Sequence, residues 1–147
     1  MRIVVGGVVG ALFVLALGAQ AALHAAEPFE GVWAKTQKEC LDEEGPNSRT
    51  LIDLANLIDG KPSPLFDQYE NHCKIERKAL SPDGTTTLTA TCFEFWEYFT
   101  KGIEGQKASI KLSPGSKSAL KIDGIPYRRC KDKSARQEPV HELRREP

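Results

Sequence analysis

Histidine and carboxylate side chains are the groups of this chain that could perform acid–base chemistry. His72 is the only histidine between residues 27 and 130, and Glu70 lies two positions before it. On an extended strand these two side chains share one face, so Glu70 could orient the imidazole of His72 as a general base. Such a base needs a nucleophile, and no serine stands in the setting of an activated one. We therefore expect His72 to be a solvated residue on the polar face of a strand.

Two pairs of carboxylates offer a second kind of chemistry. Glu94 and Glu97 lie among aromatic residues, and Asp67 and Glu70 lie on the preceding strand. A carboxyl group among rings can act as a general acid on a glycosidic bond. The alternative is a carboxylate that is exposed or is paired with an arginine or a tyrosine hydroxyl, although Glu94 could be partly buried. We expect no catalytic residue, no metal ligand and no cofactor.

The most aromatic stretch of the chain is CFEFWEYF, at residues 92–99. If it is a strand, one of its faces carries Phe93, Phe95, Glu97 and Phe99. Three phenylalanines are too many for a face that meets water. Three explanations are open: a bulge near Glu94 or Trp96 that exchanges the faces, a helical turn with the two glutamates outward, or an open aromatic surface. In the last case these four residues form the predicted binding site.

The four cysteines predict disulfides rather than a metal site. They are Cys40, Cys73, Cys92 and Cys130. An even number of cysteines in an exported chain is typical of disulfides. The gaps between them are 33, 19 and 38 residues, whereas a zinc site of four thiolates is built from C-x2-C pairs.

A turn at SPDG, residues 81–84, suggests how the cysteines pair. If Pro82 and Asp83 form a two-residue loop, opposed positions sum to 165, which places Cys73 opposite Cys92. A bulge at Gly84 would shift that sum to 166. The predicted bridges are Cys73–Cys92, from this register, and Cys40–Cys130, by elimination. The alternative pairing is Cys40–Cys73 with Cys92–Cys130.

Short strands with regular turns must position these groups. The expected strands are 29–36, 50–54, 65–79, 85–99, 108–112 and two or three segments around a turn at Asp123-Gly124. A helix over 51–58 is the alternative to the second strand, and the prolines in 60–64 should interrupt any regular element. The pattern predicts an all-β, small antiparallel barrel-like domain over residues 27–130, with two disulfides and at most one short helix.

The two ends of the chain differ from this domain. Arg2, the apolar run 3–17 and Ala19-Gln20-Ala21 have the order of a secretory signal peptide, which we place at residues 1–26. The run is shorter than the roughly 20 apolar residues of a membrane span. Residues 131–147 carry many charges and few apolar side chains, which predicts a disordered polar tail.

The whole chain has 20 basic and 20 acidic residues. Removal of residues 1–26 takes away one basic residue, Arg2, and leaves a net charge of −1. This near-neutral charge argues against a nucleic-acid partner, because phosphate binding needs an excess of lysine and arginine. We expect a periplasmic or secreted monomer without a membrane span after cleavage.

Two resemblances add to this interpretation. Gly31-Val32-Trp33, with Arg128 or Arg129 near the end of the domain, resembles the lipocalin-like or calycin barrels. This resemblance implies that Trp33 closes the barrel floor and that an arginine packs over it. The chain is also similar to small exported bacterial proteins of unknown function. The shared residues are Gly31, Trp33, Cys40, Tyr69-Glu70, Cys73-Lys74-Ile75, Cys92 and Tyr127-Arg128-Arg129-Cys130. That resemblance implies a disulfide-linked β-barrel in the periplasm and no activity.

Together these observations favour a non-enzymatic periplasmic binding protein for a protein partner or an envelope component, a glycan or a lipid. The alternatives are a periplasmic inhibitor of a cell-wall hydrolase and a hydrolase that uses Glu94 or Glu97.

Overall fold

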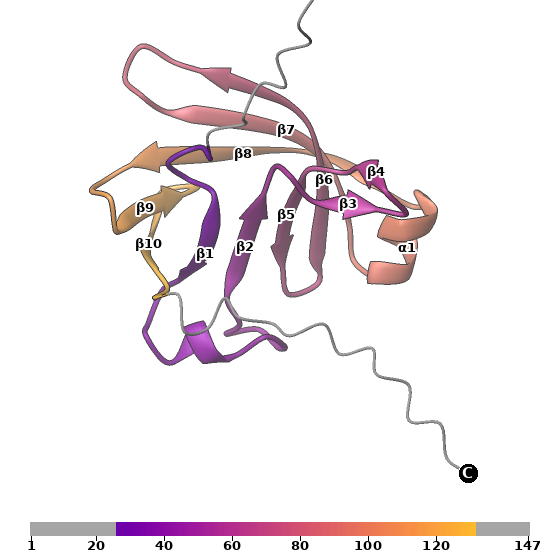
Figure 1. Cartoon of the computed structure of the whole chain (residues 1–147), viewed down its shortest axis with the longest axis horizontal. Helices are drawn as coiled ribbons and strands as arrows, with labels where there is room; N and C mark the ends of the chain where they lie inside the picture. Colours follow the sequence, from indigo (N-terminus) through magenta and orange to yellow (C-terminus); the bar gives the residue numbers. More distant parts are fainter. Residues whose placement is uncertain (1–25, 132–147) are drawn as a thin grey trace, which may run out of the picture.

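The computed structural model describes residues 26–131, which form a closed antiparallel barrel of eight strands (Figure 1). The barrel strands are β1 (Gly31–Ala34), β2 (Thr50–Asp53), β5 (Leu65–Gln68), β6 (Asn71–Leu80), β7 (Thr86–Phe93), β8 (Gln106–Pro114), β9 (Ala119–Ile122) and β10 (Ile125–Arg129). Each strand pairs with the next one along the barrel, and β10 closes it by pairing with β1. The predicted all-β barrel is therefore confirmed.

Four short elements lie outside the barrel wall. They are η1 (Glu39–Leu41), β3 (Leu57–Ile58), β4 (Lys61–Pro62) and α1 (Trp96–Lys101). The strand expected near 50–54 is confirmed as β2, and the alternative helix does not form. The expectation that 60–64 interrupts all regular structure is wrong, because β3 and β4 form a separate two-stranded sheet. An edge strand tolerates Pro62, since it has no neighbour that needs its missing N–H.

Trp33 is the anchor of the barrel core, as predicted. Its side chain is only 1% exposed, and its indole nitrogen donates a hydrogen bond to the carbonyl of Phe29 at 2.8 Å. The guanidinium of Arg129 lies 4.3 Å from the centre of the Trp33 ring. Alternate residues of the strands fill the remaining interior, among them Ile52, Phe66 and Leu88.

Both predicted disulfides are present: Cys73–Cys92 and Cys40–Cys130. The first joins directly opposed residues of β6 and β7, and the second closes a separation of 90 residues. Two disulfides suggest an oxidising, extracytoplasmic environment. Among the described residues no cysteine is free.

Cys73 and Cys92 are opposed, as the predicted register requires, but the hairpin reaches this pairing through two irregularities. The two-residue loop is wrong, because Gly84, with a φ of 82°, adds a third loop residue and shifts the outer pairs by one. A second irregularity between Ile75 and Arg77 shifts the inner pairs back. The two shifts cancel, so the cysteines face each other as a simple hairpin would place them.

The single strand predicted over 65–79 is wrong, because the structure divides this segment into β5 and β6. Tyr69 and Glu70 form a tight turn between β5 and β6, since Gln68 pairs with Asn71. Glu70 adopts a positive φ of 52°, a conformation that residues with a side chain seldom take. Tyr69 is consequently exposed instead of facing the core.

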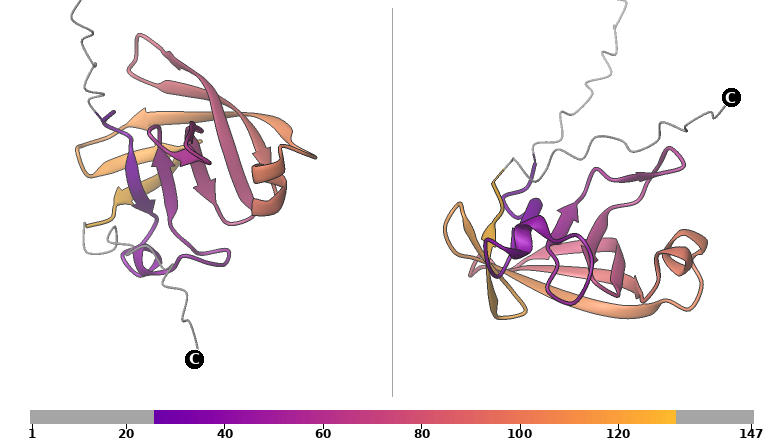
Figure 2. Two further views of the ribbon diagram at one scale, coloured as in Figure 1. Left: turned by 45° about the vertical axis from the view of Figure 1, so that its right-hand side comes forward. Right: turned by 90° about the horizontal axis from the view of Figure 1, so that it is seen from below.

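The long β6–β7 hairpin extends past the other strands, while α1 lies against the opposite ends of the same two strands (Figure 1 and Figure 2). Within residues 26–131 no helix is long and apolar enough to cross a membrane. The predicted signal peptide and polar tail fall almost wholly on residues 1–25 and 132–147, which lie outside the described residues.

Candidate binding site at the α1 end of the barrel

The predicted binding residues do not form one surface. The aromatic stretch leaves β7 and turns into α1, so the helical alternative is confirmed. Phe93 and Phe99 are each 5% exposed and pack edge to face, with ring centres 5.8 Å apart. An open face that includes these two rings is therefore wrong. Phe95 is 50% exposed, and Glu97 is exposed and forms an ion pair with Lys101 at 2.5 Å. A binding role for the four residues stays a prediction.

The rings that do reach solvent border a pocket of about 360 Å³ at this end of the barrel. The pocket lies between the loop before β2, the β5–β6 turn and the start of α1. We call it the aromatic–acidic pocket. Its rings are Tyr69, Phe95 and Trp96, and its carboxylates are Glu43, Glu44, Asp67, Glu70 and Glu94. Glu94, which could have been partly buried on a strand, is exposed.

Two of the exposed rings of the pocket, Phe95 and Trp96, are held by neighbouring rings. Trp96 is 46% exposed, yet it stacks on the buried ring of Phe99 with centres 4.8 Å apart. Phe95 meets the ring of Tyr98 edge to face at 5.3 Å. Because Phe99 is fixed in the cluster with Phe93, the orientation of Trp96 is set before any ligand arrives.

His72 is paired more firmly than a solvated residue would be, which corrects the expectation. Its Nδ1 lies 2.5 Å from Oδ1 of Asp67, its cross-strand partner on β5, and its side chain is 20% exposed. The orienting carboxylate is thus Asp67 and not Glu70. The edge of the imidazole also meets Trp96, with ring centres 5.4 Å apart. Among residues 26–131, His72 makes no hydrogen bond with a hydroxyl or a thiol.

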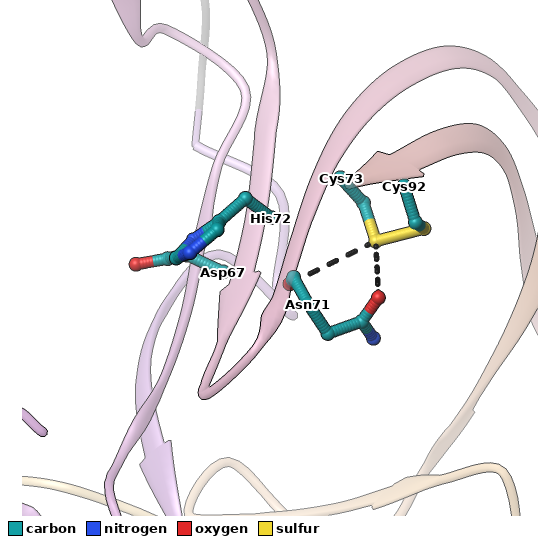
Figure 3. A network of polar contacts seen from close by, with 5 residues as sticks. All are labelled: Asp67, Asn71, His72, Cys73 and Cys92. Atoms are coloured by element: carbon teal, nitrogen blue, oxygen red, sulfur yellow. Dashed lines mark hydrogen bonds and ion pairs between the residues drawn. A yellow bond between two sulfur atoms is a disulfide. The ribbon is translucent and has the colours of Figure 1, made fainter. Parts of the chain in front are cut away.

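Figure 3 shows that the His72–Asp67 pair and the Cys73–Cys92 disulfide lie on opposite sides of β6. This follows from the alternation of side chains along a strand. On the disulfide side, the amide oxygen of Asn71 lies 3.3 Å from Sγ of Cys73. A disulfide sulfur carries no proton, so this is a close oxygen–sulfur contact and not a hydrogen bond.

The pocket is strongly negative. Its five carboxylates face one arginine, Arg49, which forms an ion pair with Glu43 at 2.8 Å, so its net charge is −4 when His72 is neutral. The Glu70 carboxylate raises the pKa of the Tyr69 hydroxyl, first by accepting its hydrogen bond and then by its charge. The site thus offers aromatic faces beside acceptors and negative charge.

Sequence reasoning missed Tyr69 and Asp67 as site residues. The alternation of the sequence predicts Tyr69 on the inward face with Cys73, because the β5–β6 turn contains neither glycine nor proline to mark it. In the sequence Asp67 is one of several carboxylates, because its pairing with His72 depends on the β5–β6 register.

A second hollow, of about 340 Å³, lies at the other end of the barrel. It is bordered by Phe29, Trp33 and Leu80 and by the β6–β7 and β8–β9 turns. It contains none of the predicted site residues.

Comparisons of the chain with protein-family models, with curated proteins and with solved structures give no match.

Proposed function

We propose that the protein is a non-enzymatic binding protein of the periplasm, and that its aromatic–acidic pocket receives a lysine or arginine side chain of a protein partner. The observation that carries this proposal is the placement of three half-exposed rings beside five carboxylates. A cation over an aromatic face is attracted by the ring, and a carboxylate forms strong hydrogen bonds with the same cation. Arginine and aromatic residues also dominate binding energy at protein interfaces.

The fixed orientation of Trp96 supports this function. Trp96 is stacked on Phe99 and touched by His72, so little side-chain entropy is lost when a partner covers it. Asp67 is oriented by His72 and presents its carboxylate without further rearrangement. A binding role needs no nucleophile, and His72 forms no hydrogen bond with one among the described residues.

We also propose a structural relation to the lipocalin-like barrels. The support is the eight-stranded meander together with the packing of Arg129 over Trp33. Arg129 further donates hydrogen bonds to the carbonyls of Glu30 and Pro28. These bonds link the segment before β1 to the end of β10. This relation concerns the fold and assigns no ligand.

Calorimetric titration with a hexa-arginine peptide tests the proposed pocket, with hexa-glutamine as the uncharged control for nonspecific peptide binding. We expect binding of hexa-arginine only. Glu94→Gln should weaken it several-fold, and Trp96→Ala on the order of tenfold, the loss typical of a central aromatic contact. Glu97→Gln is the matched control, because it removes the same charge three residues away, outside the pocket.

Equal weakening by Glu94→Gln and Glu97→Gln would show that the peptide responds to overall charge and not to the pocket. Turnover of cell-wall glycan by the wild type, lost in Glu94→Gln, would replace the binding function with the hydrolase alternative.

A further inference from the structure

A row of basic side chains lies along each side of β7 on the outer wall of the barrel. The outward side chains of β7 are three threonines: Thr87, Thr89 and Thr91. Basic side chains flank them on both sides: Lys74 and Arg77 on β6, and Lys107 and Lys111 on β8. Threonine is short and lysine and arginine are long, so the central strand forms a floor between two cationic walls. We call this surface the β7 trough.

The cations of the β7 trough are largely unpaired. Lys74, Arg77 and Lys111 make no ion pair within the part of the chain that the structure describes. Lys107 pairs with Glu76 at 2.5 Å, and Lys121 of β9 extends the surface beside Ser113. With Glu76 and Asp123 as its carboxylates, the surface has five basic groups against two acidic ones, a net charge of +3.

Glu76 is the acidic residue of β6 that lies among these basic side chains. Its carboxylate accepts hydrogen bonds from Lys107 and Thr91, and these bonds, with the charges of Lys107 and Lys74, hold its pKa below the usual range. Glu76 therefore spans the trough at Thr91. The floor stays open at Thr89 and Thr87, between Arg77 and Lys111.

The dimensions of the trough suit a single extended polymer. The two walls are two strand spacings apart, about 10 Å, and Lys107 and Lys111 are separated by about 13 Å along β8. A chain that lies on the threonines can place anionic groups against both walls. The hydroxyls of Thr87, Thr89 and Ser109 are free to exchange hydrogen bonds with hydroxyls of such a chain.

The residue types of the β7 trough favour an anionic polysaccharide over an anionic membrane surface as its ligand. None of the exposed large apolar side chains of residues 26–131 lies on it, whereas proteins that bind an anionic membrane surface usually add apolar side chains that enter the lipid. The hydroxyl floor instead matches the hydroxyls of a sugar. We infer that the β7 trough binds a linear anionic polysaccharide, with its acidic groups against the lysine and arginine walls. This inference is independent of the aromatic–acidic pocket.

Dextran sulfate is a suitable probe, with neutral dextran and phosphatidylglycerol-containing vesicles as the comparison arms. We expect the full chain to bind dextran sulfate at low salt and neither of the other two. Arg77→Gln combined with Lys111→Gln should weaken binding about tenfold and reduce the slope of log Kd against log salt by about one to two units. Glu76→Gln should strengthen binding, because it removes the carboxylate that spans the trough.

Lys38→Gln combined with Lys61→Gln is the matched control, since it removes two exposed charges from elements that do not pair with β7. Equal weakening by this control would overturn the proposal, as would vesicle binding without dextran sulfate binding. Thr89→Val tests the floor: the hydroxyl is lost while the branched shape stays. We expect roughly threefold weaker binding with an unchanged salt slope, because no charge is removed. An unchanged affinity would overturn the assignment of a sugar polymer.

Discussion

The pKa of the exposed carboxylate of Glu76 depends on the side chains that surround it. Lys107 and Thr91 lower its pKa in the folded state. The stabilisation it contributes is therefore fully present above the ordinary glutamate pKa of about 4.3 and is lost as the pH falls through the lowered folded value. We expect Glu76→Gln to be less stable than the wild type near neutral pH and equal to it in acid. Urea denaturation of both proteins at several pH values measures this, and a pH-independent difference would contradict it.

The aromatic residues divide into core and surface by burial. Truncation of Phe93 or Phe99 to alanine should lower the free energy of unfolding by about 3 kcal/mol, as large aromatic truncations in cores do. Trp33→Ala should cost about 3–5 kcal/mol. Phe95→Ala removes a half-exposed ring and should cost less than about 1 kcal/mol. Thermal and urea melts with intact disulfides compare the four variants. A large loss at Phe95 would mean that its ring is packed more tightly than its exposure indicates.

Among the elements, the β5–β6 turn contains a residue, Glu70, that has a strained backbone conformation and also lines the aromatic–acidic pocket. Glu70 holds a left-handed conformation that costs roughly 1–2 kcal/mol for a residue with a side chain. Glu70→Gly should therefore stabilise the fold by about 0.5–1 kcal/mol, while hexa-arginine binding weakens because a pocket carboxylate is lost. Urea denaturation and calorimetry on the same variant measure the two effects. Loss of both stability and binding would show that the Glu70 side chain supports the turn.

Local patterns predicted most barrel strands, because alternation of apolar and polar residues reflects burial directly. They did not locate the turn at Tyr69-Glu70, where a strained non-glycine residue replaces the usual turn signal. They also left the helix at Trp96–Lys101 as one of several alternatives, since Phe93 and Phe99 are buried by residues distant in sequence, such as Leu65. The pocket was unpredictable for the same reason: three separate segments form it.

At the scale of the whole molecule, the two disulfides should differ in their effect on stability. In the chain-entropy model, the separation of 90 residues between Cys40 and Cys130 corresponds to about 4.5 kcal/mol, and that of 19 residues between Cys73 and Cys92 to about 3 kcal/mol. Replacement of each pair by alanine, followed by urea denaturation, tests this order. A larger loss from the Cys73–Cys92 pair would show that packing inside the barrel outweighs the chain entropy.

The Cys40–Cys130 bridge also determines how the molecule carries mechanical load. A force applied between Ala26 and Lys131 passes from Cys40 to Cys130 through the sulfur atoms, so it never reaches the chain between them. Only residues 26–40 can be drawn out, about 50 Å of extended chain, against roughly 360 Å when both bridges are reduced. β1 is the single barrel strand on that path. Under tension the oxidised protein would thus lose only β1 from the barrel. The other seven strands and both proposed binding surfaces lie between the bridged cysteines and would stay folded.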